Sequence, residues 1–136
     1  MALSNFSLAK TCGIIGYSAA LWGIGVLTIR YCGRYLFQTN SSRSLAMAST
    51  VPGCYAIIRL TQALFSLNMQ DTATAFVLGT GAASILDGIT HIWFPSAYED
   101  PELQKKNALA ACTTSRYGSG WLLFFVGVGL TMVVLM

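Results

Sequence analysis

The sequence predicts an all-α integral membrane protein in which four transmembrane helices form one bundle. Of the 136 residues, 54% are hydrophobic and only 10% are charged, whereas a soluble domain carries about 25% charged residues. The mean hydropathy is +0.60. Four windows are long and apolar enough to cross about 30 Å of hydrocarbon. Each is expected to be helical, because backbone groups in lipid must be paired within the segment.

The expected spans run from Thr11 to Ile29, Leu45 to Leu67, Ala73 to Phe94, and Gly118 to Met136. The first is longer than the apolar part of a signal peptide and is followed by no A-x-A-like cleavage site, so we expect a retained anchor. At this length residues 1–136 are expected to form one domain. In the loop before the last span, Asp100-Pro101-Glu102 predicts a further helix start, since it offers an N-cap, a proline at N1 and an acid in the first turn.

Lysine and arginine are distributed unevenly between the two sides of these spans. Because cytoplasmic loops are enriched in these residues, the richer side, with loops one and three, is expected to be cytoplasmic. An internal membrane such as the endoplasmic reticulum is the expected location. Loop one holds Arg30, Arg34 and Arg43, loop three holds Lys105, Lys106 and Arg116, and the opposite side has Lys10. An aromatic belt is expected on the richer side at Tyr31, Trp93, Tyr117 and Trp121.

Composition also excludes several classes of function. The net charge is +3, but the eight Lys and Arg form no basic run, so nucleic acid is not an expected partner. The four cysteines show no CxxC spacing and there is one histidine, so no zinc site or bis-histidyl haem site can be assembled. With no flavin or nicotinamide motif either, no cofactor is expected.

Small residues mark the faces on which membrane helices pack closely. Pro52-Gly53 in the second span is expected to kink that helix, which either opens space for a ligand or only helps packing. The expected contact faces are Gly16 with Ala20 and Ala19 with Gly23 in the first span, Ala75, Gly79 and Ala83 in the third, and Gly127 and Gly129 in the fourth.

Two spans carry stripes of polar residues. An ionisable residue at the centre of a span costs about 2.5–3.5 kcal/mol on the insertion scale, so it needs a reason to be there. With 3.6 residues per turn, each stripe projects from one sector of its helix, and we expect the two stripes to face each other. They are Tyr55, Arg59, Gln62 and Ser66 on the second span, and Thr80, Ser84, Asp87 and His91 on the third.

Asp87 and His91 are the candidate catalytic residues, because a desolvated carboxyl can act as acid or base and a histidine one turn away can relay its proton. Two other interpretations stay open: Asp87 and Arg59 pair to lock two helices together, or the stripe is a proton or ion pathway. A channel is disfavoured because no ring of charges exists, and a transporter because the chain shows no repeated halves. The candidate binding residues are Tyr55, Arg59, Gln62, Thr80 and Ser84.

With Gly53 and Arg59 in the second span and Asp87-Gly88 in the third, the chain resembles small four-span membrane proteins of unknown function from fungi and bacteria. The resemblance covers roughly Val51 to Gly129. Some of these proteins are encoded beside genes of secondary-metabolite biosynthesis. The resemblance implies an accessory role near membrane-bound steps of natural-product synthesis.

Two functions follow as hypotheses. The preferred one is a multi-pass accessory protein that assists the biosynthesis or handling of a lipophilic metabolite; the alternative is a membrane-embedded isomerase or cyclase that uses acid–base chemistry at Asp87. An enzyme requires an apolar chamber that opens toward Asp87, and a scaffold does not. The expected partners are membrane lipids, a lipophilic small molecule, and membrane-protein partners or further copies of the chain.

Overall fold

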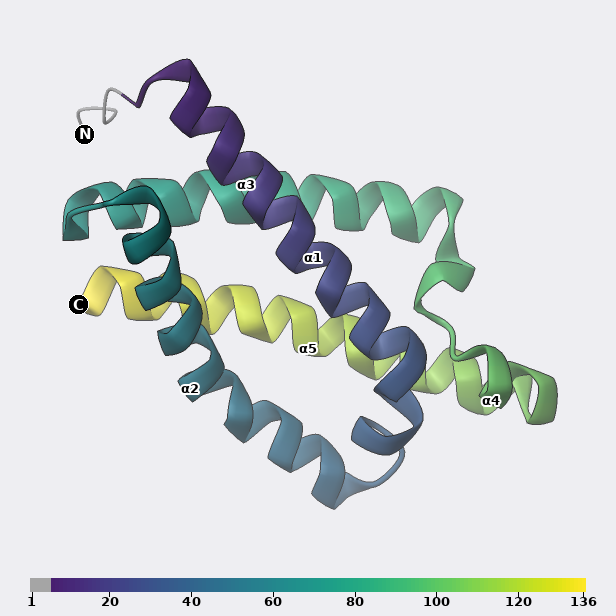
Figure 1. Cartoon of the computed structure of the whole chain (residues 1–136). Helices are drawn as coiled ribbons and strands as arrows, with labels where there is room; N and C mark the ends of the chain where they lie inside the picture. The colour runs from purple at the N-terminus through teal and green to yellow at the C-terminus, as the bar shows by residue number, and fades with distance from the viewer. Residues whose placement is uncertain (1–5) are drawn as a thin grey trace.

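The computed structural model describes residues 6–136, and in that part of the chain all regular structure is helical (Figure 1). This confirms the predicted all-α class. The elements in order are α1 (Leu8–Leu36), α2 (Asn40–Phe65), α3 (Met69–Trp93), the 3-10 helix η1 (Pro95–Tyr98), α4 (Pro101–Lys106) and α5 (Ala108–Leu135).

Three of the helices in residues 6–136 are long and apolar enough to cross a membrane, namely α1, α3 and α5. The predicted spans in these helices are therefore supported, whereas the predicted span from Leu45 to Leu67 is not. Helix α2 covers this window as far as Phe65, and within the window it carries Ser49, Thr50, Arg59 and Gln62. These polar side chains offset the apolar residues around them.

The helices extend beyond the predicted spans because helix formation does not stop where the apolar window ends. Helix α5 begins at Ala108, where Asn107 caps it by accepting from the Ala110 N–H, and it continues through Gly118. The helix start predicted at Asp100 is correct, since its carboxylate accepts from the backbone N–H groups of Glu102 and Leu103. That helix, α4, ends at Lys106 and does not run on into α5.

Helix α1 packs chiefly on α3, and α2 packs chiefly on α5, which also contacts α1 and α3. In Figure 1 the start of α1, the connection between α2 and α3, and the C-terminus lie towards one end of the molecule. The end of α1, η1 and α4 lie towards the other. The helices thus form a bundle with two distinct ends.

Predicted small-residue contacts occur on α3 and α5. A Cβ atom added at Gly79 would collide with the Ser18 hydroxyl of α1, and one at Gly129 would lie 2.6 Å from the Phe76 ring of α3. Neither site has room for a side chain. The close approach of α3 to both α1 and α5 therefore depends on these two glycines.

Two further close contacts were not predicted. A Cβ atom at Gly118 would lie 2.5 Å from Ile29, and one at Gly25 would lie 2.8 Å from Leu122, so both glycines bring α1 against α5. Spacing along one helix does not show which face its neighbour covers. Three glycines expected at contacts instead meet no neighbouring atom within 4 Å: Gly16, Gly23 and Gly127.

Of the four residues expected in an aromatic belt, one points into the protein. Trp121 is not in it, because its indole N–H points inward to the backbone oxygen of Ala46, at 3.2 Å, and to the Thr50 hydroxyl, at 3.0 Å. It joins α5 to α2. The other three aromatic residues are exposed: Tyr31, Trp93 and Tyr117.

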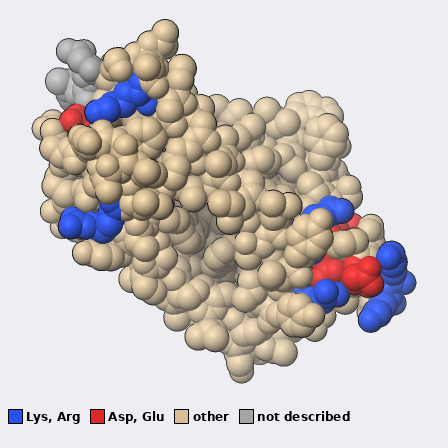
Figure 2. Space-filling model, viewed as in Figure 1, with Lys and Arg blue, Asp and Glu red and all other residues tan. Residues whose placement is uncertain are grey.

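Charged residues gather at two opposite ends of the face shown in Figure 2, with an uncharged band between them. The segments that follow α1 and α3 meet at one end, where Arg34 of α1 lies 3.5 Å from Asp100. Six of the eight Lys and Arg residues belong to these segments and the helix ends beside them. Membrane proteins commonly keep their lysine and arginine residues near the ends of their spans in this way.

Candidate functional site

A chamber of about 380 Å³ lies between α1, α2, α3 and α5. Its lining is mainly apolar and includes Ile14, Leu21, Phe76, Leu122 and Phe125. Pockets that hold small molecules commonly have volumes of about 300–1,000 Å³ and a few polar groups among apolar walls. The chamber therefore has the size and the lining of a site for a small lipophilic molecule.

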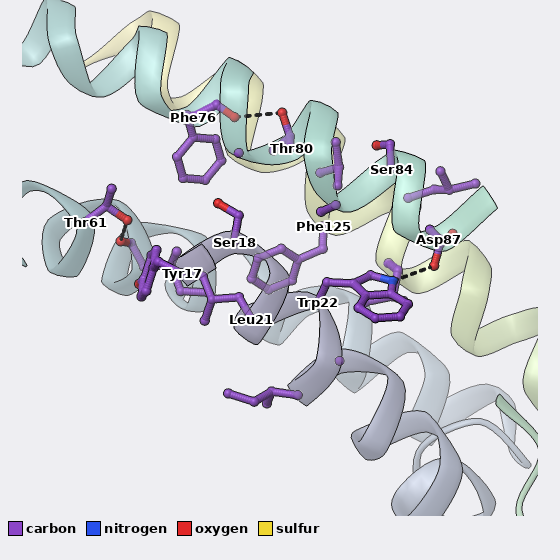
Figure 3. A pocket seen from close by; sticks show the side chains of 18 of the residues that line it. Tyr17, Ser18, Leu21, Trp22, Thr61, Phe76, Thr80, Ser84, Asp87 and Phe125 are labelled. Atoms are coloured by element: carbon purple, nitrogen blue, oxygen red, sulfur yellow. Dashed lines mark hydrogen bonds between the residues drawn. The ribbon is translucent and has the colours of Figure 1, made fainter. Parts of the chain in front are cut away.

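Asp87 on α3 lies in the wall of this chamber (Figure 3). The Trp22 indole N–H of α1 donates to Asp87 Oδ1 at 3.1 Å, and the Tyr98 hydroxyl of η1 donates to the same oxygen. Its side chain is 19% exposed. Two donors from separate elements thus hold one carboxylate oxygen and fix the direction of the group.

His91 lies one turn after Asp87, as the sequence predicted. Its Nε2 is 3.6 Å from Asp87 Oδ2, and its ring stacks on that of Tyr98, with centroids 4.3 Å apart and an interplanar angle of 7°. Among residues 6–136, no lysine or arginine forms an ion pair with Asp87. The histidine is therefore the only basic partner of this carboxylate in the described chain.

Tyr98 is fully buried beneath the end of α3. Burial raises the pKa of its hydroxyl, and the hydrogen bond and negative charge of Asp87 raise this pKa further. The phenol therefore keeps its proton at neutral pH and remains a donor to Asp87.

Two arginines of α1 hold the segment that carries Tyr98. The Arg30 guanidinium donates to the backbone oxygens of Ser96, at 2.8 Å, and Ala97, at 3.4 Å. One turn later, Arg34 Nε lies 3.5 Å from Asp100 Oδ2, and this carboxylate is only 2% exposed. From the sequence, both arginines predicted only the orientation; in the structure they also hold η1 and the residues after it on α1.

The structure brings one predicted polar stripe to the chamber. Thr80, Ser84 and Asp87 all line it, whereas His91 contacts Asp87 without lining the chamber. The Thr80 hydroxyl donates to the backbone oxygen of Phe76 at 2.7 Å, so it cannot donate the same proton to a ligand. The residues of α3 singled out from the sequence are thus gathered at one site.

The structure places the second predicted stripe elsewhere. Tyr55 and Arg59 are exposed on α2, and Arg59 donates to Gln62 at 3.2 Å instead of pairing with Asp87. Gln62 in turn donates to the Met69 sulfur at 2.8 Å. The expectation that the two stripes face each other is wrong, because α2 turns its other face inward. That face buries Cys54, Ile58 and Thr61.

Trp22 and Tyr98 are the site residues that sequence reasoning missed. Trp22 lies in an apolar span, where its sequence context does not distinguish it from the other hydrophobic residues. Tyr98 belongs to a loop, and no periodic pattern in the sequence indicates that this loop packs against α3. The only hint was local: a tryptophan or tyrosine buried in a membrane bundle needs a partner for its polar atom. Which partner that would be depended on the tertiary fold.

In residues 6–136 no group of three or more His, Cys, Asp or Glu side chains could hold a metal ion. The chemistry that the described residues support is proton exchange and hydrogen bonding at Asp87, with His91 beside it. The fold and the site together define a helical protein with three candidate membrane spans and a partly open, mostly apolar chamber. No family model, no curated protein and no solved structure matches the chain.

Proposed function

We propose that this is a multi-pass membrane protein that binds a lipophilic small molecule in the chamber and acts as an accessory protein in the handling of that molecule. The observation that supports the proposal most directly is an apolar chamber of about 380 Å³ with one oriented carboxylate in its wall. The apolar part of the bound molecule would pack against the chamber walls. A hydroxyl or amine at one end of this molecule would donate a hydrogen bond to Asp87.

The presence of Asp87 in the chamber favours a ligand over packing alone. A carboxylate in a membrane helix carries an insertion cost, which reaches about 2.5–3.5 kcal/mol at the helix centre and which an apolar side chain would avoid. The Trp22 and Tyr98 donors both bind Oδ1, and they leave Oδ2 with the more distant His91 contact at 3.6 Å. One carboxylate oxygen is therefore available for a further donor.

We propose α2 as a fourth span in the membrane, beside α1, α3 and α5. Its 26 residues would extend about 39 Å at 1.5 Å per residue, and it packs along α5. The arginine-rich end, with the segments after α1 and α3, would face the cytoplasm of an internal membrane such as the endoplasmic reticulum. Ile24 and Leu123, two exposed residues of the chamber wall, would then provide access from the lipid.

Mass spectrometry of molecules that co-purify with the protein tests this function. We expect a discrete lipophilic compound with the wild type and its loss in Ala83→Leu, which adds side-chain volume at the chamber wall. Ala20→Leu is the matched control, because Ala20 is exposed on α1 and does not line the chamber. Equal recovery of the compound from both variants would refute the proposed site.

A second candidate function is isomerisation or cyclisation of the bound molecule by acid–base chemistry. The arrangement of Asp87 with His91 and Tyr98 favours it. In an isomerisation, Asp87 would remove a proton from a carbon beside an unsaturated group, the double bond would shift, and the same proton would return to another carbon. This exchange is balanced without any cofactor or co-reactant.

Asp87→Asn separates the two functions, because the amide matches the carboxyl in shape but cannot exchange the proton. If the protein is an enzyme, the variant should bind the compound but form no product. If it is an accessory protein, the amount of product should change only as much as the binding of the compound changes. Because of the sequence resemblance, we also propose that this molecule belongs to secondary metabolism, and a gene deletion with metabolite profiling tests that role. An accumulated precursor would identify the substrate, while an unchanged profile would contradict that role.

A further inference from the structure

The carboxylate of Asp87 is the only acidic group in the lining of the chamber, and no lysine, arginine or histidine of residues 6–136 lines it. The neighbouring His91 lies outside the lining, and its Nε2 is 3.6 Å from Asp87 Oδ2, which is too far for a hydrogen bond. The arginines at this end of α1 are engaged elsewhere, since Arg30 binds the backbone of η1 and Arg34 pairs with Asp100. The chamber wall therefore carries a negative charge without a lysine or arginine to balance it.

A carboxylate that has largely left water is unfavourable unless a cation and hydrogen bonds compensate its charge. Trp22 and Tyr98 are neutral donors, and both bind Oδ1. Oδ2 is left with the His91 contact, and the Asp87 side chain is still 19% exposed. A protonated amine would bring positive charge and up to three N–H donors to this oxygen. A hydroxyl group would bring one donor and no charge.

The position of Asp87 along α3 also suits an amphiphilic amine. Asp87 lies six residues before Trp93, the last residue of α3, or about 9 Å from that end along the axis. The lining continues along α3 as far as Phe76, about 16 Å further from the same end. In Figure 3, Asp87 and Trp22 lie at one end of the group of side chains and Phe76 lies towards the other. A charged head would thus lie near the membrane surface, with its apolar body deeper in the chamber.

We infer that the molecule held in the chamber is an amphiphilic amine, whose protonated nitrogen donates to Asp87 and supplies the counter-ion that the chamber lining lacks. The inference rests on the proposed binding function and specifies the class of ligand. Fatty acids and other lipophilic anions are excluded, because their charge has the same sign as that of Asp87.

Three naphthalene probes of similar size test the class of ligand at neutral pH, where naphthylethylamine is protonated, naphthylethanol is neutral and naphthylacetic acid is ionised. The affinity of the purified protein in detergent for each probe is measured from the probe-dependent rise in melting temperature. We expect the wild type to bind the amine about ten-fold more tightly than the alcohol. The acid should bind more weakly than the alcohol. An alcohol or an acid that binds as tightly as the amine would overturn the inference without any variant.

Asp87→Asn should reduce the ratio of amine affinity to alcohol affinity to about one, because the amide has no charge to attract the ammonium group. Its affinity for the alcohol should change much less, since an amide still forms hydrogen bonds with a hydroxyl group. Binding of the alcohol also shows that the variant is folded. Asp71→Asn is the matched control, because it makes the same substitution in the first turn of α3, outside the chamber. This control should keep the preference for the amine, and a preference that persists in Asp87→Asn would overturn the inference.

The two proposals fail in different ways. If the amine and the alcohol stabilise the wild type equally, the chamber binds ligands but does not select a cation. If none of the probes raises the melting temperature of the wild type, the binding function fails, and the selection of an amine fails with it.

Discussion

The indole N–H of Trp22 donates to the Asp87 carboxylate at 3.1 Å, and this hydrogen bond links α1 to α3 across the wall of the chamber. A hydrogen bond to a charged group stabilises a fold by about 1.5–3 kcal/mol. The side chain of Asp87 is 19% exposed, so the lower part of this range applies. The contact joins residues 65 positions apart in the sequence, so its removal should affect the packing of both helices.

We predict that Trp22→Phe lowers the free energy of unfolding by about 2 kcal/mol, because it removes a donor to a charged acceptor. Thermal unfolding in detergent measures the change. Trp93→Phe is the control, since Trp93 is 65% exposed, and surface substitutions usually change stability by less than about 0.5 kcal/mol. Equal effects of the two substitutions would show that the Trp22 hydrogen bond contributes nothing specific.

Arg34→Gln should destabilise the protein by about 2 kcal/mol, because it leaves the buried Asp100 carboxylate without its cation. The expected loss of stability is smaller than for a fully buried ion pair because Arg34 is 34% exposed. Asp100→Asn in the same chain should recover most of the loss, since asparagine removes the charge and can still cap α4.

The control for this pair is Lys105→Gln, which breaks the exposed contact between Lys105 and Glu102. It should change stability by less than about 0.5 kcal/mol. Thermal unfolding of all four chains gives the comparison. A double variant no more stable than Arg34→Gln alone would argue against charge compensation at Asp100.

Arg59→Gln and Asp87→Asn should act independently. Arg59 donates to Gln62 and forms no ion pair with Asp87. Residues without shared partners usually show additive effects on stability, within about 0.5 kcal/mol. A double-mutant cycle measures the coupling. A coupling above about 1 kcal/mol would instead support the alternative in which these two residues lock the helices together.

Gly79→Leu should lower the free energy of unfolding by about 3 kcal/mol, because the added side chain has no space between α3 and Ser18. Gly16→Leu is the matched control, since a Cβ atom there meets nothing within 4 Å. Melting temperatures in detergent test the pair. A wild-type melting temperature for Gly79→Leu would mean that this face of α3 is open to lipid.

The uneven distribution of lysine and arginine predicts the orientation in the membrane. A reporter that is active only in the lumen should be active when fused after Met136. The same reporter inserted near Asn107, between α4 and α5, should be silent. The reverse pattern would overturn the orientation and place the arginine-rich end in the lumen.

The sequence by itself determined the features that depend on local periodicity. Apolar windows identified α1, α3 and α5 as candidate spans, and 3.6 residues per turn placed Thr80, Ser84 and Asp87 on one face of α3. Asp100 and Pro101 identified the start of α4 for the same reason, since a helix cap involves only the first turn of its own helix. None of these predictions needed knowledge of a neighbouring helix.

Only the tertiary structure decided which helix faces meet. Amphipathic signals are weak in a chain that is apolar on nearly every side, so the sequence could not show that α2 turns Cys54 and Ile58 inward and Arg59 outward. The partners of Asp87 are equally non-local: Trp22 is 65 residues away, and Tyr98 returns through a loop held by Arg30. Such contacts are set by helix packing and loop closure, which leave no periodic pattern in the chain.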